Sequence, residues 1–445
     1  MNQIIKGTCV DISSEGKGVV KYDNDVIFCD GLFIGEEALI SLLYKRAGVY
    51  YGKVKQLLKI SKDRIEPKCK ICTSCGGCQY QQIAYYKQLE YKTKRVENAF
   101  KRIAGIDYQI PLCLGMDNPY FYRNKIQVPF QKDKKGNVIY GFYRENSHEI
   151  IKVKQCYIES PLSSEILWDI KLLLEKYHIS TYNELTKKGV FRYALIRTSK
   201  RLDALMVVLV TTSLYFKGLN LLVDSLLKKH PEITTLIINE NNKNTNVVLG
   251  ENNRIMFGEG FIKDDILGLD FEISPKSFFQ VNPTQVEVLY QKALSLLDEK
   301  DQIILDAYSG VGTIGLIASK KAKKVISVEI VEQAHKNAIM NAKRNNINNI
   351  EFFMDDASNF IRKYQGDIDV VIMDPPRKGS DQIFLQTLID KKIKKIIYIS
   401  CDPETLARDV KYLSNDYTVN YVQPVDMFPQ TSHVETVACL RLKER

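Results

Sequence analysis

The stretch Ile303-Ile304-Leu305-Asp306-Ala307-Tyr308-Ser309-Gly310-Val311-Gly312-Thr313-Ile314-Gly315 decides the fold of the C-terminal part of this chain. An apolar run leads into a turn with three glycines, and a helical pattern follows. Glycine permits a tight turn and close approach of the backbone to a ligand. This order is typical of the first strand, turn and helix of a Rossmann-like sheet, although the glycine motif alone is weak evidence.

Strands and helices continue to alternate after this stretch. Strands are predicted at 325–329, 350–353, 369–373 and 395–400, with a helix near 331–345. Such alternation indicates a doubly wound, mostly parallel sheet. We therefore predict a Rossmann-like domain over residues 271–445.

Two carboxylates follow strands of this sheet, where ligands bind in open sheets. Glu329 ends the strand after the glycine turn and suits the hydroxyls of an adenosine ribose. These features fit either a nicotinamide cofactor or S-adenosylmethionine. Asp374, in Asp374-Pro375-Pro376-Arg377, resembles the substrate-side motif of adenosylmethionine-dependent methyltransferases. An ordinary strand-ending turn is the alternative for the Pro-Pro step.

A candidate nucleophile follows the next apolar strand, in Ile399-Ser400-Cys401-Asp402-Pro403. Parallel strands end at one edge of a sheet, so Cys401 should project from the same edge as Asp374. Glu435 precedes the last apolar strand and could return to this edge. The alternatives are a core cysteine and a solvated carboxylate.

The N-terminal residues 1–60 read as short strands separated by Gly, Asp and Asn turns. The predicted strands are 4–12, 18–22, 26–29, 37–44 and 50–58. Five short strands in this length fit a small β-barrel of the oligonucleotide-binding kind.

The net charge of +10 is concentrated at the end of this barrel. Residues 45–70 contain nine basic and two acidic side chains, interleaved at the start with tyrosines. Lysine neutralises phosphate and tyrosine stacks on bases, so this strip suits a nucleic-acid surface. Solvated strand faces are the alternative.

Four of the ten cysteines, Cys69, Cys72, Cys75 and Cys78, fall within ten residues. In a chain without a secretory signal this crowding indicates metal rather than disulfides, and both zinc and iron–sulfur clusters use such ligands. Cys156 is a possible distant ligand or a core residue. The cysteines with apolar neighbours are predicted to be core residues: Cys9, Cys29, Cys113 and Cys439.

Residues 61–270 are predicted to form an α+β middle domain that includes the cysteine loop. A helix beginning near residue 82, within 82–110, could pack on the catalytic domain. The expected strands are 125–130, 138–143, 193–198, 204–211 and 234–239. The expected helices are 163–178 and 216–229. No apolar run approaches the ~18 residues of a membrane span, and the N-terminus has no signal-peptide core, so we expect a cytoplasmic protein.

Five segments occur together in the order of a known family. They are Ser277-Phe278-Phe279-Gln280-Val281-Asn282, Asp306-Ala307-Tyr308-Ser309-Gly310, Asp374-Pro375-Pro376-Arg377-Lys378-Gly379, Ser400-Cys401-Asp402-Pro403 and His433-Val434-Glu435-Thr436. Together they resemble the bacterial RNA uracil-5-methyltransferase family. The N-terminal barrel is similar to a TRAM domain, and the cysteine spacing resembles the [4Fe–4S] site of the ribosomal RNA members.

The resemblance implies a role for each matching residue. Cys401 matches the family's nucleophile and Glu435 its base. The implied S-adenosylmethionine-binding set is Gln280, Tyr308, Glu329 and Asp374, with Thr313 and Asp356 as weaker members. The implied [4Fe–4S] ligands are Cys69, Cys75, Cys78 and Cys156, with Cys72 as an extra thiol that departs from the family's pattern.

The resemblance thus implies methylation of carbon 5 of a uridine in 23S ribosomal RNA, by a monomer without a membrane partner. The competing readings are the same reaction on transfer RNA, a non-catalytic RNA-binding or assembly factor, and a nicotinamide oxidoreductase. Residues 120–124 and the pair Phe278 and Phe279 could contact RNA, although core packing is equally expected for the two phenylalanines.

Overall fold

The computed structural model describes residues 3–144, 147, 149–199, 204–244, 247–298 and 302–444. The chain divides into two compact units. The first comprises the residues up to 119, residues 288–298 and those from 358 onward; the second comprises residues 120–287 and 299–357. Two of the four boundaries fall within helices, α5 (Pro283–Leu294) and α8 (Ala357–Lys363).

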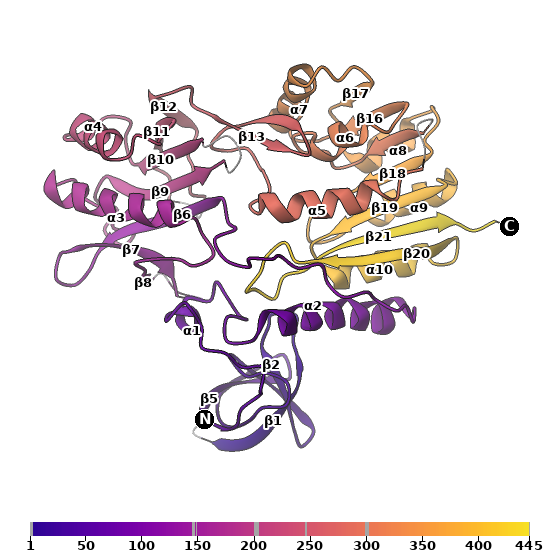
Figure 1. The fold of residues 1–445 in the computed structure, drawn as a ribbon, viewed down its shortest axis with the longest axis horizontal. Helices are drawn as coiled ribbons and strands as arrows, with labels where there is room; N and C mark the ends of the chain where they lie inside the picture. The colour runs from indigo at the N-terminus through magenta and orange to yellow at the C-terminus, as the bar shows by residue number, and fades with distance from the viewer. Residues whose placement is uncertain are drawn as a thin grey trace. The chain divides into compact units, whose positions relative to one another are not determined.

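The first unit begins with a five-stranded barrel (Figure 1), as the sequence predicts, and the barrel is closed with the strand order β1-β2-β3-β5-β4. Closure leaves no unpaired strand edge. Gly52 allows a close approach inside it, because a Cβ there would lie 2.5 Å from Ile40. The strands are β1 (Ile4–Ile12), β2 (Gly18–Tyr22), β3 (Asp25–Cys29), β4 (Glu37–Arg46) and β5 (Val49–Lys59).

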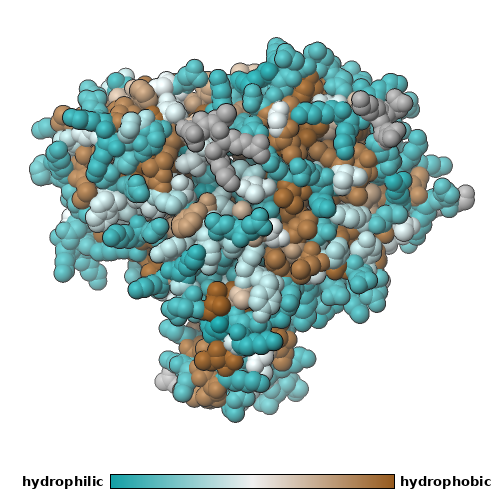
Figure 2. Space-filling model, viewed as in Figure 1, coloured by the Kyte–Doolittle hydropathy of each residue, from teal (hydrophilic) through white to brown (hydrophobic). Residues whose placement is uncertain are grey.

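The barrel surface mixes polar and apolar side chains, as Figure 2 shows. The large apolar residues exposed in this part of the chain are Ile4, Val10, Leu43, Tyr44, Leu58 and Ile60. The ring of Tyr44 stacks on that of Tyr51 with centroids 4.8 Å apart, and Lys45 lies over the Tyr50 ring. Exposed aromatic surface of Tyr44 therefore adjoins the basic residues of 45–70.

A cysteine loop and a long helix follow the barrel. The helices are α1 (Cys72–Cys75), α2 (Tyr85–Ala99) and the π-helix η1 (Phe100–Ala104). Phe33 of the barrel packs in one buried cluster with Tyr80, Ile83 and the α2 residue Tyr91. This cluster joins α2 to the barrel.

The C-terminal part of the first unit contains four strands in the order β18-β19-β21-β20. The pair β18-β19 is parallel, whereas β19-β21 and β20-β21 are antiparallel. The elements are β18 (Val370–Met373), α9 (Gln382–Asp390), β19 (Lys395–Ser400), α10 (Pro403–Leu413), β20 (Tyr417–Val425) and β21 (Glu435–Leu442).

The second unit contains a seven-stranded sheet in the order β12-β11-β10-β9-β6-β7-β8. Helix α3 packs against β7 and against α4. The elements are β6 (Lys125–Lys132), β7 (Val138–Tyr143), β8 (Ile150–Lys152), α3 (Pro161–Lys176), β9 (Phe191–Thr198), β10 (Leu205–Thr211), α4 (Leu219–Lys229), β11 (Thr235–Glu240) and β12 (Asn252–Phe257).

A hairpin and three parallel strands complete the second unit. The hairpin joins β13 (Ile262–Ile266) and β14 (Leu269–Ile273). The parallel strands lie in the order β17-β16-β15, with helices between them in sequence. They are β15 (Ile303–Asp306), α6 (Thr313–Ala318), β16 (Lys324–Val328), α7 (Glu332–Arg344) and β17 (Ile350–Phe353). This is the strand and helix alternation that the sequence predicts.

The strand predictions at 350–353 and 395–400 agree with β17 and β19. The domain boundaries at residues 60 and 270 stay predictions. Among the described residues, no helix combines the length and the apolar composition that crossing a bilayer requires.

Candidate active site

The glycine turn of the second unit depends on its glycines. Gly310 and Gly312 have φ angles of 56° and 84°, which side chains with a Cβ rarely adopt. A Cβ on Gly315 would lie 2.7 Å from Oδ2 of Asp306, and the Gly315 N–H donates to this oxygen at 2.9 Å. The turn therefore brings the start of α6 against the end of β15.

Glu329 lies beside this turn at the end of β16. Its Oε2 accepts the N–H of Gly310 at 2.8 Å, and its Oε1 accepts the N–H of Val331 at 2.7 Å. A carboxylate can accept about four hydrogen bonds, so both oxygens retain capacity for ligand hydroxyls. The parallel pairing of β15 and β16 places Tyr308 and Glu329 at the same sheet edge.

The other cofactor candidates of the second unit lie at element ends. Thr313 is the first residue of α6, and Asp356 follows β17, which is parallel to β16. The Gln280 carbonyl accepts Nδ2 of Asn124 at 3.3 Å, and the Gln280 side chain is half-buried. Among the nearby aromatics, Phe279 is buried against Phe271, whereas Phe278 is 74% exposed.

The structure brings Asp374, Cys401 and Glu435 together within the first unit. Asp374 and Cys401 directly follow the neighbouring parallel strands β18 and β19. In the antiparallel pair β19-β21, Ser400 lies opposite Thr436, which places Glu435 beside Cys401. Asp374 and Glu435 are near enough for their charges to raise the pKa of Cys401, and Asp374 is near enough to raise that of Glu435.

Burial and these carboxyl groups hold the Cys401 thiol protonated at neutral pH. Burial raises its pKa to about 11, and the charges of Glu435 and Asp374 contribute to the increase. Two features oppose this increase of the Cys401 pKa. Arg377 lowers the pKa, and Cys401 immediately precedes the N-cap of α10, Asp402, where the helix N-terminus favours a thiolate.

The two carboxyl groups also have raised pKa values. Burial raises the pKa of Asp374 to about 7. Burial and then the charge of Asp374 raise the pKa of Glu435 to about 8, whereas Arg377 lowers it. A buried carboxyl with a pKa near neutrality can both accept and release a proton at physiological pH.

Arg377 is a charged residue beside this site to which sequence reasoning gave no role. It follows the Pro-Pro step directly, and its exposed side chain acts electrostatically on both Cys401 and Glu435. The only signal in the sequence was its place after Asp374-Pro375-Pro376.

Helix α2 supports the loop that leads to Glu435. Lys92 forms a buried ion pair with Asp426, and Arg95 donates to the Ser432 carbonyl at 3.1 Å. The Gln88 side chain donates to Oε1 of Gln430 at 3.0 Å. These bonds fix the loop that ends at the first residue of β21.

The four clustered thiols only partly fit a metal site. Burial raises the pKa values of Cys72 and Cys78, and the charges of neighbouring cysteines contribute. The thiols are therefore close together, and their donor chemistry suits iron or zinc. However, no group of three or more His, Cys, Asp or Glu residues in the described chain is arranged to hold a metal ion. Cys156 belongs to the second unit, where its N–H donates to Ser164 at 3.4 Å.

Comparison with known sequences identifies relatives of the whole chain. Residues 84–443 match the family model of tRNA (uracil-5-)-methyltransferase. An uncharacterized RNA methyltransferase of Oceanobacillus iheyensis is 41% identical, covering 99% of this chain and 97% of that protein. One from Clostridium tetani is 42% identical, covering 96% and 94%.

A solved structure is similar over the same extent. The tRNA (uracil-54, C5)-methyltransferase of Pyrococcus abyssi, in complex with S-adenosyl-L-homocysteine, matches with a TM-score of 0.80 and 27% identity. The match covers 98% of this chain and 100% of that chain. The likeness therefore includes the N-terminal barrel segment.

Proposed function

Because the chain belongs to the tRNA (uracil-5-)-methyltransferase family of adenosylmethionine-dependent RNA methyltransferases, we propose that it methylates carbon 5 of one uridine in 23S ribosomal RNA. The observation that carries this proposal is the grouping of Cys401, Asp374 and Glu435 at the ends of three neighbouring strands. A nicotinamide oxidoreductase would have no use for this thiol, and the family assignment excludes that reading.

Carbon 5 of uracil is too weak a nucleophile to accept a methyl group unaided. In the proposed reaction the Cys401 thiolate adds to carbon 6, and the ring becomes an enolate with negative charge available at carbon 5. S-adenosylmethionine supplies the electrophilic methyl group when it is bound. Arg377 and the N-terminus of α10 favour the thiolate that the first step requires.

Glu435 then acts as the base of the proposed reaction. The proton on carbon 5 must leave before Cys401 can be expelled and the double bond restored. Glu435 lies beside Cys401, and its raised pKa makes its carboxylate a competent acceptor near neutral pH. The bonds from α2 to the preceding loop support its position.

The proposed cofactor site combines Glu329 with the glycine turn. Glu329 accepts two backbone N–H groups and keeps lone pairs for ribose hydroxyls, while Gly310, where a Cβ would meet no other atom within 4 Å, leaves room for the ligand. The remaining proposed contacts are Gln280, Tyr308, Thr313, Asp356 and Asp374. The open space beside Gly310 fits a bound nucleoside, whereas the absent side chain of Gly312 makes room for Ala338.

The RNA is proposed to contact the TRAM-like barrel. Exposed Tyr44 and the lysines of strand β5 offer stacking surface and positive charge together. The target uracil must also leave its stack, since carbon 6 is attacked from the ring face. A loop in cytoplasmic ribosomal RNA would allow this at low cost.

Transfer RNA is the second candidate substrate. The similar Pyrococcus abyssi enzyme acts on uracil 54 of tRNA, and its match covers the barrel segment as well. The presence of the barrel therefore does not indicate which of the two RNAs is the substrate. The clustered cysteines support the ribosomal substrate through their resemblance to the ribosomal RNA members.

Incubating the pure protein with S-adenosylmethionine and unmodified ribosomal or transfer RNA would distinguish the substrates. Nuclease digestion and mass spectrometry should locate 5-methyluridine in the ribosomal RNA only. Cys401→Ala should abolish the product but retain RNA binding, whereas Cys439→Ala, a matched core variant, should keep activity. Product in transfer RNA alone would replace the ribosomal assignment.

A [4Fe–4S] cluster on Cys69, Cys75, Cys78 and Cys156 is proposed as a structural element, since the methyl transfer needs no electron. Its loop leads to Gln79, whose Oε1 accepts the Ser432 N–H at 3.3 Å, close to Glu435 in sequence. Anaerobically purified protein should contain iron and absorb visible light. Cys75→Ser should lose both, together with RNA affinity; full affinity without iron would refute the role.

A further inference from the structure

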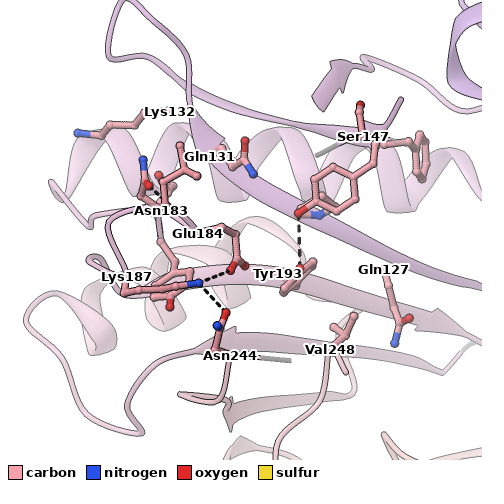
Figure 3. Close-up of a pocket in the computed structure, with 16 residues that line it drawn as sticks. Gln127, Gln131, Lys132, Ser147, Asn183, Glu184, Lys187, Tyr193, Asn244 and Val248 are labelled. Atoms are coloured by element: carbon pink, nitrogen blue, oxygen red, sulfur yellow. Dashed lines mark hydrogen bonds and ion pairs between the residues drawn. The ribbon is translucent and has the colours of Figure 1, made fainter. Parts of the chain in front are cut away.

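The second unit has a cavity of about 900 Å³ against its seven-stranded sheet (Figure 3). Alternate residues of β6, Gln127, Pro129 and Gln131, line it, while the intervening Val128 and Phe130 are buried on the opposite face. The volume lies within the range of about 300–1,000 Å³ that is typical of ligand sites. None of the proposed catalytic or cofactor residues lines this cavity.

The lining combines carboxamides with aromatic rings. Gln127, Gln131, Asn183 and Asn244 contribute amide groups, each of which donates and accepts hydrogen bonds. The hydroxyls of Tyr143 and Tyr193 lie 3.5 Å apart, and both residues line the cavity; Figure 3 shows the Tyr193 side chain among them. Adjacent donors and acceptors next to aromatic faces match the edge and the face of an unpaired nucleobase.

The charges around the cavity favour an anionic ligand. Glu184 is already bonded, since its Oε1 lies 3.1 Å from Arg192 and its Oε2 lies 4.0 Å from Lys187. Lys132 is exposed and forms no ion pair within the described part of the chain. One free cation at the rim of a neutral, aromatic cavity suits the phosphate of a single nucleotide.

The same strand face continues toward the proposed cofactor segment. Pro129 lies opposite Tyr193, and Lys125 lies opposite Arg197, about 13 Å further along β6 at the usual strand rise. Arg197 donates to the Ser277 carbonyl at 3.1 Å. Its Nε and Nη1 are buried without hydrogen-bond partners among the described residues. The segment that contains Gln280 therefore lies near the same sheet face as the cavity, further along the strands.

We propose that this cavity binds an unpaired nucleotide of the substrate RNA other than the target uridine. Its base stacks on Tyr193, its edge bonds to Gln127 or Gln131, and its phosphate lies near Lys132. The inference rests on the proposed RNA methylation and adds a second point of sequence recognition. A second nucleotide held in this way would fix the register of the RNA.

The test compares Tyr193→Leu and Tyr193→Phe in the full-length protein. The leucine variant should raise the KM for RNA at least about fivefold, the lower limit for losing one base–aromatic stack. The phenylalanine variant retains the ring and should behave as wild type. Tyr215→Leu, at a 69% exposed tyrosine outside the cavity, is the matched control and should change nothing.

Folding and the proposed function are checked separately. Melting temperature and S-adenosylhomocysteine affinity should be equal in all variants, and Gln127→Ala offers a milder second test if Tyr193→Leu unfolds. Wild-type methylation failing on every RNA would refute the proposed function. If the wild-type protein is active and the KM for RNA is unchanged in both Tyr193→Leu and Gln127→Ala, nucleotide binding in the cavity is refuted while the proposed methylation stands.

Photocrosslinking gives a readout that does not depend on turnover. RNA substituted with 5-bromouridine should crosslink to the peptide that contains Tyr193 or Tyr143. Crosslinks found only in other peptides would overturn the proposal. Variants that bind naked RNA normally but bind ribosomal particles weakly would instead assign the cavity to a protein partner, which also overturns it.

Discussion

At the scale of single residues, the first unit places one thiol and two carboxyl groups in a buried site where their charges compete. The pKa of Cys401 is about 11, that of Glu435 about 8 and that of Asp374 about 7. Burial is the main cause in each case; the charge of Asp374 also raises the pKa of Glu435, and both carboxylates raise that of Cys401, so protonating a carboxyl favours the thiolate. Arg377 is the cation that offsets this repulsion.

Glu435→Gln should allow Cys401 to add to carbon 6 of the uracil but should block the later release of the methylated RNA. The change removes a negative charge that raises the Cys401 pKa, so adduct formation should persist, while loss of the base should lower turnover by about 10²–10⁴-fold. A protein–RNA complex that survives denaturing electrophoresis is the expected result. The double variant with Cys401→Ala should give none. A turnover equal to wild type would rule out Glu435 as the base.

The methylation rate should rise with pH. Cys401 and Glu435 both act deprotonated, and both pKa values are raised, so the active fraction grows as pH increases from 6 toward 9. Well below these pKa values kcat/KM should rise at least about tenfold per pH unit. RNA binding, measured separately by filter retention, should not rise over this range. A flat or falling rate profile would contradict the assignment of these groups.

At the scale of elements, α2 connects the N-terminal part of the first unit to the loop before β21. Lys92 and Asp426 are 1% and 0% exposed, so their ion pair is shielded from water. Asp426 also accepts the Tyr85 hydroxyl at 2.8 Å and is therefore bonded to α2 twice. A helix far in sequence from the proposed catalytic residues thus supports the loop that leads to Glu435.

Lys92→Met should destabilise the protein strongly. It leaves the Asp426 carboxylate buried without its cation, which costs about 3–5 kcal/mol of unfolding free energy. Lys94→Met, on the same helix with a 47% exposed side chain, should cost less than about 1 kcal/mol. Denaturant unfolding monitored by circular dichroism measures both. Equal stability of the two variants would show that the buried pair contributes little.

Sequence reasoning succeeded where a local pattern decides the element. The runs 350–353 and 395–400 are apolar and bounded by turns, and both are strands as predicted. The helix predicted from residue 82 instead begins at Tyr85, and its α-helical part ends at Ala99, where a π-helix continues to Ala104. Apolar periodicity cannot separate these two hydrogen-bond patterns.

The site was predictable only in part, for a physical reason. Asp374 and Cys401 follow apolar strands, so their common edge could be inferred from chain order. The contact between Lys92 and Asp426 spans 334 residues and depends on tertiary packing that no local pattern encodes. The action of Arg377 on both reactive groups likewise depends on spatial proximity.

At the scale of the whole molecule, surplus positive charge is concentrated on the last strand of the barrel and the loop after it. Residues 45–70 have nine basic and two acidic side chains against a net charge of +10 for the chain. Lys53, Lys55 and Lys59 of β5 are exposed, and none forms an ion pair within the described chain. They are therefore available to replace the counterions of RNA.

Replacing Lys53, Lys55 and Lys59 together by Ala should weaken RNA binding and its salt dependence. Each lost phosphate contact lowers the slope of log K against log salt by about 0.7, so the triple variant should lose about 2 units. Fluorescence anisotropy at several salt concentrations measures this slope. The same change at the exposed residues Lys217, Lys228 and Lys263 is the control. Identical slopes in both triple variants would show that the barrel lysines do not contact the RNA.

The division of the first unit between both ends of the chain has a consequence for the newly made polypeptide. Lys92 emerges 334 residues before Asp426, an interval of roughly 17–67 s at typical translation rates. During that interval the Lys92 ammonium group has no carboxylate partner. It must therefore stay in contact with water and cannot yet be buried. The N-terminal part therefore completes its packing last, and a chain that terminates before residue 426 exposes an unfinished helix to proteases and chaperones.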